Sequence, residues 1–342
     1  MSLIAAAIGA AERAPLPDFA LRAGVDALVG GAKRRLRPQG PGADIRFALE
    51  MAEHPVALEV EAANAQHYEL PEAFFGLVLG PRRKYSCCLY GDGAETLAQA
   101  EIRALAETCA HAELADGQSI LELGCGWGSL SLWMAEQYPA ARITAVSNSQ
   151  SQRAYIERQA AAWGLTNLTV ITADMNQFEA GGTFDRIVSV EMFEHMSNWR
   201  ALLARARRWL KPEGRMFIHV FSHRDTPYRF DHHDEADWIG RYFFTGGLMP
   251  SHGLIRCFDD LFAVEAEWTW NGRHYERTAL DWLANMDRKA DRVRPILREV
   301  YGRDAGLWFK RWRLFFLATA GLFSHDGGEE WTVSHYRLRP VT

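Results

Sequence analysis

The feature that most constrains this chain is a regular alternation of short apolar segments with amphipathic helical segments between residues 97 and 220. Strands are expected at 119–123, 142–146, 168–172, 186–190 and 215–220, and helices at 97–111, 130–137, 152–163 and 199–210. The tetrapeptide Lys211-Pro212-Glu213-Gly214 predicts a turn before the last strand. Short apolar strands separated by helices form right-handed βαβ units, so the sequence predicts a doubly wound α/β sheet that is covered on both faces.

The segments on either side of this alternation predict a helical N-terminal part and a helical cap. Residues 15–37 have the pattern of an amphipathic helix, and the Pro- and Gly-rich stretch 38–42 breaks it. Residues 263–270 and 331–338 alternate in the manner of strands, and residues 278–323 between them are mostly helical. We expect these late helices to cover the functional edge of the sheet.

The composition excludes several classes of protein. A hydrophobic fraction of 48% argues against disorder, and a net charge of −5 gives no electrostatic basis for binding nucleic acid. The longest late apolar run, 314–323, is shorter than the ~20 residues of a membrane span. Five scattered cysteines form no disulfide framework, so a soluble, cytoplasmic protein is expected. The polar stretch 231–235 predicts a solvated loop, and no metal site is expected.

A glycine-rich turn, Gly124-Cys125-Gly126-Trp127-Gly128, follows the first expected strand. Its glycines let the backbone approach a ligand closely, and the next helix would present free N–H groups to a carboxylate. The spacing differs from the GxGxxG of dinucleotide sites, and the second strand ends at Asn148 without the acidic residue that a nicotinamide ribose needs. Asp174 suits an adenine amino group, and a helix N-cap is its equal alternative. With Glu122 before the loop, the pattern favours S-adenosylmethionine (SAM) over NAD.

An ionisable cluster, Glu191, Glu194 and His195, follows the fourth expected strand. In a helical turn these residues stand at i, i+3 and i+4 on one face, at the edge where open α/β sheets place their sites. Two carboxylates beside an imidazole perturb one another's pKa values. A general base is what methyl transfer to a protonated amine requires, because only the neutral amine attacks. The alternative is a helix start with favourable acidic residues.

Several segments together resemble the cyclopropane fatty acid synthase superfamily of methyltransferases, and within it the coclaurine N-methyltransferase type. The superfamily motifs are Tyr85-Ser86-Cys87, Leu121 to Ser129, Glu191 to Met196 and Asn271-Gly272-Arg273-His274-Tyr275. The segments typical of the subgroup are 67–71, 80–86, 241–247 and 328–331. The likeness extends from about residue 60 to the end of the chain.

The resemblance implies a seven-stranded Rossmann-like class I methyltransferase fold and methyl transfer from SAM to a small aromatic or cyclic amine, with S-adenosylhomocysteine (SAH) as product. It implies cofactor contacts from Tyr85, Ser86, Glu122, Gly124, Gly126, Asn148, Gln152, Asp174 and Met175. Glu194 and His195 match the acid/base pair of the N-methyltransferases, and Glu191 would anchor a cationic amine. A small-molecule amine is the expected partner, with no nucleic acid and no membrane, and a homodimer stays open.

The lipid synthases of the superfamily supply the alternative function, which is carbon methylation of an unsaturated phospholipid. They hold a bicarbonate with a Cys, a Glu, a His and a Tyr, for which the matching candidates are Cys87, Glu194, His219 and Tyr275. They carry Gly at the position of Glu191, where an extra carboxylate obstructs a bicarbonate and favours a cation. This difference favours nitrogen as the acceptor.

The expected substrate pocket lies under an aromatic cap. Substrate contacts are expected from Tyr68, His219, Phe244, Tyr275 and Trp331, and the cap aromatics that offer cation–π contact are Tyr242, Phe243, Phe244, Trp282, Trp308, Trp312 and Trp331. We expect residues 1–95 to form a helical N-terminal segment and cofactor lid. Residues 96–342 would form the SAM-binding domain, with substrate-cap insertions at about 221–260 and 276–325.

Overall fold

The structure is a computed structural model that describes residues 8–9, 12–14, 16–36, 40, 42–58, 70–91, 93–235 and 237–341. Its helices are α2 (Asp18–Arg35), α3 (Ala43–Met51), α5 (Glu72–Val78), α6 (Leu97–His111), α7 (Ser129–Gln137), α8 (Gln150–Ala162), α9 (Trp199–Trp209), α10 (Trp238–Tyr242), α11 (Arg273–Arg288), α12 (Ala290–Tyr301) and α13 (Ala305–Ser324). Its strands are β1 (Ser119–Leu123), β2 (Arg142–Ser147), β3 (Leu168–Thr172), β4 (Phe184–Val190), β5 (Leu210–His223), β6 (Tyr228–Arg229), β7 (Leu248–Met249), β8 (Phe262–Trp270) and β9 (Trp331–Pro340).

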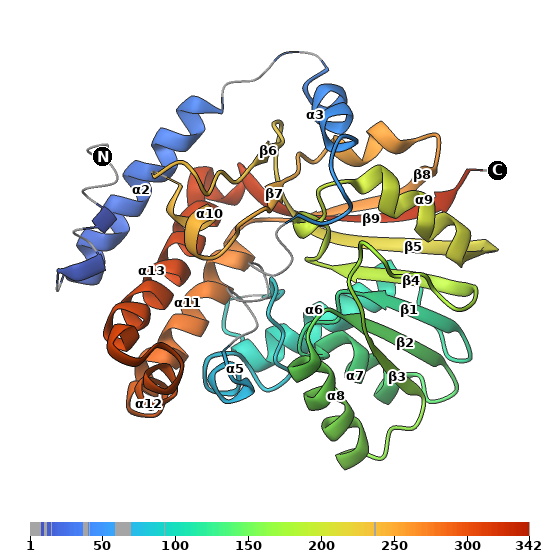
Figure 1. Cartoon of the computed structure of the whole chain (residues 1–342), viewed down its shortest axis with the longest axis horizontal. Coiled ribbons are helices and arrows are strands. Elements are labelled where there is room, and N and C mark those ends of the chain that lie inside the picture. Colours follow the sequence, from blue (N-terminus) through green and yellow to red (C-terminus); the bar gives the residue numbers. More distant parts are fainter. Residues whose placement is uncertain are drawn as a thin grey trace.

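Seven of the strands form one sheet in the order β3-β2-β1-β4-β5-β9-β8 (Figure 1). Strands β1 to β5 are parallel, and β9 runs antiparallel to both of its neighbours, β5 and β8. The predicted doubly wound α/β sheet is confirmed. Because β1 pairs with β2 on one side and β4 on the other, the strand order reverses there, and this reversal opens a crevice at the carboxyl edge of the sheet.

The expected turn at Lys211–Gly214 is wrong, because these residues lie within β5. Leu210 pairs with Phe184, and Arg215 pairs with Arg186, so the tetrapeptide forms a bulge in an otherwise continuous pairing. The ammonium group of Lys211 binds Asp185 at 2.8 Å and holds the bulge against β4. The turn-forming residues are present, but the strand continues past them.

The cap helices α11 and α13 pack together on one side of the sheet, and α2 lies along α13 (Figure 1). Ion pairs join α2 to this cap: Arg313 contacts Asp18 at 3.1 Å, and Lys33 contacts Glu330 at 2.8 Å. The basic end of α2 therefore pairs with acidic groups beside the cap.

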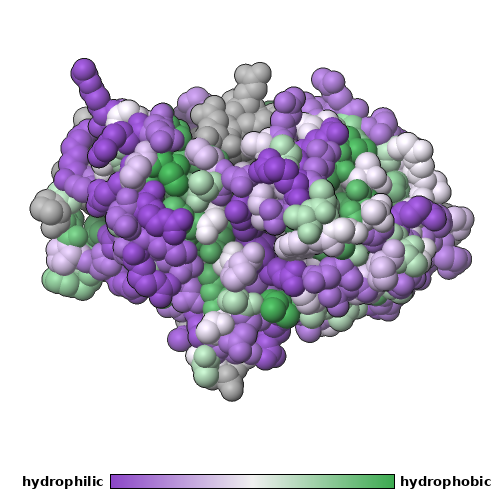
Figure 2. Space-filling view, turned by 90° about the horizontal axis from the view of Figure 1, so that it is seen from below, coloured by the Kyte–Doolittle hydropathy of each residue, from purple (hydrophilic) through white to green (hydrophobic). Residues whose placement is uncertain are grey.

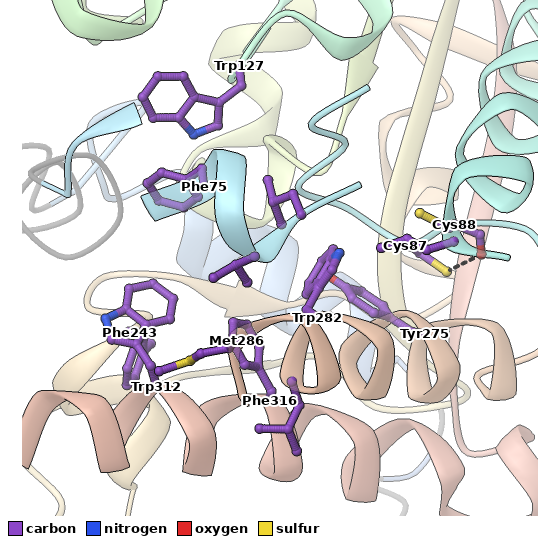
Figure 3. Packing of buried hydrophobic residues seen from close by; sticks show 14 of the residues in the cluster. Phe75, Cys87, Cys88, Trp127, Phe243, Tyr275, Trp282, Met286, Trp312 and Phe316 are labelled. Atoms are coloured by element: carbon purple, nitrogen blue, oxygen red, sulfur yellow. Dashed lines mark hydrogen bonds between the residues drawn. The ribbon is translucent and has the colours of Figure 1, made fainter. Parts of the chain in front are cut away.

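The cap has an aromatic core. Figure 3 shows Phe75, Trp282, Met286, Trp312 and Phe316 packed in one cluster between the helices. Trp282 and Trp312, which were expected in the aromatic cap, are at most 1% exposed. They stabilise the cap from within.

No helix in the described part of the chain is long and apolar enough to cross a membrane. The face seen in Figure 2 is largely hydrophilic, and its hydrophobic residues form small separate patches.

Candidate active site

The glycine loop joins β1 to α7 in a conformation that glycine adopts easily. The φ angles are +79° at Gly124, +51° at Gly126 and +75° at Gly128. A Cβ atom at Gly124 would lie 2.6 Å from Met192 Cβ, and one at Gly128 would lie 2.5 Å from a side-chain carbon of Ile156. A Cβ atom at Gly126 would meet no described atom within 4 Å. Gly124 and Gly128 therefore allow close packing, whereas Gly126 faces open space.

Two cavities flank this loop at the carboxyl edge of the sheet. The first is lined by Ala57, Leu58, Gly124, Gly126, Val146, Ser147, Asn148, Gln152, Ala173, Asp174, Met175, Glu191, Met192, His195, Met196 and Thr245. The second is lined by Arg83, Lys84, Tyr85, Ser86, Leu105, Thr108, Glu122, Gly124, Cys125, Gly126, Trp127, Ser129, Leu130, Gln152, Val190 and Glu191. Each of the nine residues expected to contact the cofactor lines one or both cavities. Leu58 and Thr245 are lining residues that sequence reasoning missed.

Unpaired polar atoms around the loop fit a polar ligand. The side-chain Nε2 of Gln152, Oγ of Ser129 and Nε1 of Trp127 are buried and have no hydrogen-bond partner among the described residues. The Oε1 atom of Gln152 accepts a hydrogen bond of 2.7 Å from Ser147, which fixes the amide in place. Buried polar groups normally have partners. The carboxylate, ammonium and ribose hydroxyl groups of SAM can supply them.

Two acidic residues contribute to these cavities in different ways. Glu122 is buried and accepts a hydrogen bond from the hydroxyl of Ser131, and burial raises its pKa to about 7. Asp174 Oδ1 accepts a hydrogen bond of 2.9 Å from the backbone N–H of Asn176. No helix follows Asp174, because the chain forms a turn there, so the helix N-cap alternative is wrong. Its carboxylate borders the first cavity.

Glu191 lies at the junction of the two cavities and is held from several sides. Its Oε1 accepts a hydrogen bond of 2.9 Å from the backbone N–H of Cys87 and lies 3.1 Å from His219 Nε2. Its Oε2 accepts a hydrogen bond of 2.7 Å from the hydroxyl of Tyr275. The backbone N–H of Glu191 donates to the carbonyl of His219 at 2.8 Å. The side chain is therefore fixed where strand β4 ends.

The expected common helical face of Glu191, Glu194 and His195 is wrong. The φ angle of Glu191 is +46°, so this residue lies outside any right-handed turn, and only Phe193–His195 forms a 3₁₀ turn. The unusual backbone turns Glu191 towards His219 and Tyr275, while Glu194 points elsewhere. Residues in this conformation gather at functional sites.

The buried Lys84 balances the charge of Glu191. Its Nζ donates hydrogen bonds to Ser86 Oγ at 2.5 Å and to the carbonyl of Cys87 at 2.6 Å. Burial raises the pKa of Glu191, and the Lys84 charge and the hydrogen bonds from Cys87 and Tyr275 oppose that rise. Lys84 lines the second cavity and is a residue that sequence reasoning missed, although it stands directly before Tyr85-Ser86.

Glu194 and His195 have different surroundings. Glu194 is fully buried, lines neither cavity, and accepts a hydrogen bond of 2.7 Å from the backbone N–H of Phe221. Burial and the Glu191 charge raise the pKa of Glu194 well above its ordinary value. His195 lines the first cavity, and its ring stacks on Phe244 with 4.5 Å between centroids. Only the imidazole of this pair reaches the cavity.

None of the described residues expected to bind substrate lines either cavity, but three of them contact residues that do. His219 and Tyr275 contact Glu191, and Phe244 contacts His195. Figure 3 shows Tyr275 on its helix, in the same region as Cys87. Trp331 is buried in β9, donates a hydrogen bond of 3.1 Å to the Tyr228 hydroxyl, and lines neither cavity. Tyr68 lies outside the described residues.

Comparison with known proteins agrees with this geometry. The profile of the family described as mycolic acid cyclopropane synthetase matches residues 58–327. (S)-Coclaurine N-methyltransferase of Thalictrum flavum subsp. glaucum is 36% identical over 296 residues, which cover 85% of this chain and 82% of that protein. Cyclopropane-fatty-acyl-phospholipid synthase of Escherichia coli (strain K12) is 32% identical over 271 residues, which cover 78% and 66%. A crystal structure of coclaurine N-methyltransferase bound to N-methylheliamine and SAH matches with a TM-score of 0.94 and 31% identity, covering 99% of this chain and 100% of that chain.

Proposed function

The chain belongs to the mycolic acid cyclopropane synthetase family and is a SAM-dependent methyltransferase, and from this premise we propose that its acceptor is the nitrogen of a small aromatic or cyclic amine. The relatives named as N-methyltransferases support nitrogen as the acceptor. The observation that carries the proposal is the position and bonding of the Glu191 carboxylate.

Glu191 occupies the place that a bicarbonate would need. Three polar groups converge on its carboxylate: the backbone N–H of Cys87 and the hydroxyl of Tyr275, which donate to it, and the imidazole of His219, which lies 3.1 Å away. In the lipid synthases, the resemblance implies a Cys, a Glu, a His and a Tyr around bicarbonate and a Gly in place of Glu191. Of the matching residues here, Glu194 instead accepts a hydrogen bond from the backbone N–H of Phe221. Here the protein supplies the anion itself, and a second anion beside it would be repelled.

The backbone at Glu191 strengthens this argument. A non-glycine residue in the left-handed region costs about 1–2 kcal/mol, and Glu191 adopts φ +46°. Glycine would avoid that cost. A strained, buried carboxylate at the junction of two cavities therefore favours a role in binding or proton transfer over a role in stability.

Each residue of the site has its own part in the proposed methyl transfer. SAM supplies an electrophilic methyl group when it is bound. Glu191 attracts the protonated amine, and the Glu191 carboxylate or the His195 imidazole takes the proton that blocks the nitrogen lone pair. Phe244 supports the imidazole, and Glu194 positions the 3₁₀ turn through its bond to Phe221.

The N-terminal part of the chain supports a lid role in this proposal. Ala57, Leu58 and the run Arg83–Ser86 line the cavities, so the cofactor would be covered from the N-terminal side. All five cysteines are free, which supports a cytoplasmic location.

The experiment that tests the acceptor uses methyl-labelled SAM. A panel of secondary cyclic amines and, separately, vesicles of unsaturated phosphatidylethanolamine are incubated with the protein, with and without added bicarbonate. We expect labelled N-methyl product, no labelled lipid and no effect of bicarbonate. Cyclopropane product from the vesicles, without methylated amine, would establish the lipid function instead.

A further inference from the structure

A chain of buried histidines connects Glu191 to the surface. We propose that the proton removed at Glu191 leaves the site through His219, His335 and His111 to Glu107. The inference rests on the proposed function for the source of the proton. The relay is otherwise a separate matter, because the proposed nitrogen acceptor does not depend on His335, His111 or Glu107.

The inner end of the chain begins at the cavity wall. Glu191 Oε1 lies 3.1 Å from Nε2 of His219, and His219 is fully buried. The other ring nitrogen of His219, Nδ1, has no partner among the described residues. A buried nitrogen without a partner is uncommon, and here it belongs to the residue that contacts the proposed base.

The middle of the chain is a cross-strand pair. His219 of β5 and His335 of β9 are direct partners in the sheet, with ring centroids 4.5 Å apart and a tilt of 33°. His335 is fully buried, and its Nε2 also has no partner in the described part of the chain. The Nδ1 of His219 and the Nε2 of His335, both unpaired among the described residues, mark the gap across which the relay has to pass a proton. The proposed relay includes a rotation of one ring within this contact, which joins the two nitrogens.

At the outer end of the histidine chain, each group lies within hydrogen-bond distance of the next. His335 Nδ1 lies 2.9 Å from Nδ1 of His111, the last residue of α6. His111 Nε2 lies 3.1 Å from Oε1 of Glu107, one helical turn earlier. The Glu107 side chain is 44% exposed, so it exchanges protons with water.

Apolar rings surround the chain and exclude competing partners. Trp268 stacks on His111 with 3.8 Å between ring centroids, Trp270 lies 4.3 Å from His335, and Phe217 lies 5.2 Å from His335. The charged groups that act on the histidines are Lys84 at the inner end and Arg337 with Glu107 at the outer end. Burial lowers the pKa values of all three histidines, so each ring is neutral at neutral pH.

Neutral imidazole rings pass a proton along by exchanging tautomers, and the number of protons that enter the chain equals the number that leave it. The carboxyl proton of Glu191 passes to His219 Nε2, while the proton on His219 Nδ1 passes to His335 Nε2. The proton on His335 Nδ1 passes to His111 Nδ1, and the proton on His111 Nε2 passes to Glu107 and then to water. One proton enters, one leaves, and no bond to carbon changes.

The test breaks the relay at its outer end, where the active site is untouched. His111→Phe keeps the aromatic contact with Trp268 and removes both nitrogens, and Glu107→Gln removes the surface acceptor. Glu136→Gln, on the exposed face of α7, is the matched control. Steady-state rates are measured in dilute buffer and again with added imidazole, using the best acceptor of the wild-type protein.

We expect His111→Phe to lower kcat about tenfold or more in dilute buffer, with unchanged KM for SAM and acceptor. Imidazole should restore the rate, and the solvent deuterium isotope effect on kcat should rise. Glu107→Gln should show a smaller loss of the same kind. A full rate in both variants, or a loss that buffer does not change, overturns the relay. Wild-type activity on amines decides the proposed function separately, because each variant is compared with wild type on the same acceptor.

A second measurement needs no turnover. In protein with ¹⁵N-labelled histidine and no SAM, Glu191→Gln should change the tautomer populations of His335 and His111, as seen by NMR. Unchanged resonances for both rings would show that the chain is not connected.

Discussion

The hydroxyl of Tyr275, near the start of α11, donates a hydrogen bond of 2.7 Å to Oε2 of Glu191 at the end of β4. The two residues are 84 positions apart, so the cap and the sheet meet at this carboxylate. Burial and the Glu191 charge raise the pKa of Tyr275 well above its ordinary value, so its phenol remains a donor. The contact therefore stabilises the ionised form of Glu191.

Tyr275→Phe should move the acid limb of the kcat/KM profile to higher pH. The lost hydrogen bond lowered the pKa of Glu191, so its removal raises that pKa and the carboxylate ionises later. A hydrogen bond to a charged group contributes about 1.5 kcal/mol, which corresponds to about one pH unit. Tyr242→Phe, in the cap but away from Glu191, is the control. An unmoved acid limb in Tyr275→Phe would show that Glu191 need not be ionised.

Gly126→Val should abolish SAH binding while the protein stays folded. A side chain at Gly126 would enter the open space beside the loop, which we assign to the cofactor. Gly164→Val is a matched control, because Gly164 also has a positive φ and open surroundings but lines neither cavity. Calorimetry with SAH and thermal melting of both variants separate the two effects. Equal SAH affinity in both would remove the cofactor assignment.

His195→Ala should lower turnover by about two to four powers of ten at neutral pH, as the loss of a general base does. The penalty should shrink at high pH, where more of the free amine is already neutral. SAH affinity should hardly change, because the glycine loop and Asp174 remain. His232→Ala, in the polar loop, serves as the control. A destabilised but normally active His195→Ala protein would end the catalytic assignment.

Glu122→Gln should change how stability depends on pH. From the ordinary value of 4.5 to about 7, the unfolded chain has released the Glu122 proton while the folded protein still holds it. The free energy of unfolding therefore falls as pH rises through this window, by up to about 3 kcal/mol. The amide cannot ionise, so the variant should gain Tm relative to wild type between pH 5 and pH 7.5. Glu157→Gln on the surface should show no such gain. A Tm difference between Glu122→Gln and wild type that does not change with pH would contradict the raised pKa of Glu122.

Local patterns in the sequence were sufficient to predict the parallel strands of the sheet and several of the residues that border the two cavities. The apolar runs predicted β1 and β3 to the residue, and the residues that follow β1 to β4 meet at one edge because parallel strands share a direction. This explains why Gly124, Asn148, Asp174 and Glu191 border common cavities.

The sequence did not show features that depend on the backbone at one residue or on distant contacts. A φ of +46° at Glu191 has no signature in a Glu-Met-Phe-Glu-His run, so a regular helical turn was the natural prediction. The bulge at Lys211–Gly214 is held by Asp185 of another strand. His111 and His335 meet only through tertiary structure, 224 residues apart. Trp331 has the composition of a pocket residue, but its strand is central enough to bury it.

The left-handed backbone at Glu191 has an evolutionary consequence. Because glycine accepts this conformation without strain, glutamate and glycine can replace one another at this position without a change of fold. Codons for glutamate and glycine differ by one nucleotide, so a single point mutation can remove the Glu191 carboxylate and leave its three polar partners free for a dissolved anion. Acceptor chemistry in this family can then diverge abruptly, on an unchanged scaffold, rather than through a gradual remodelling of the pocket.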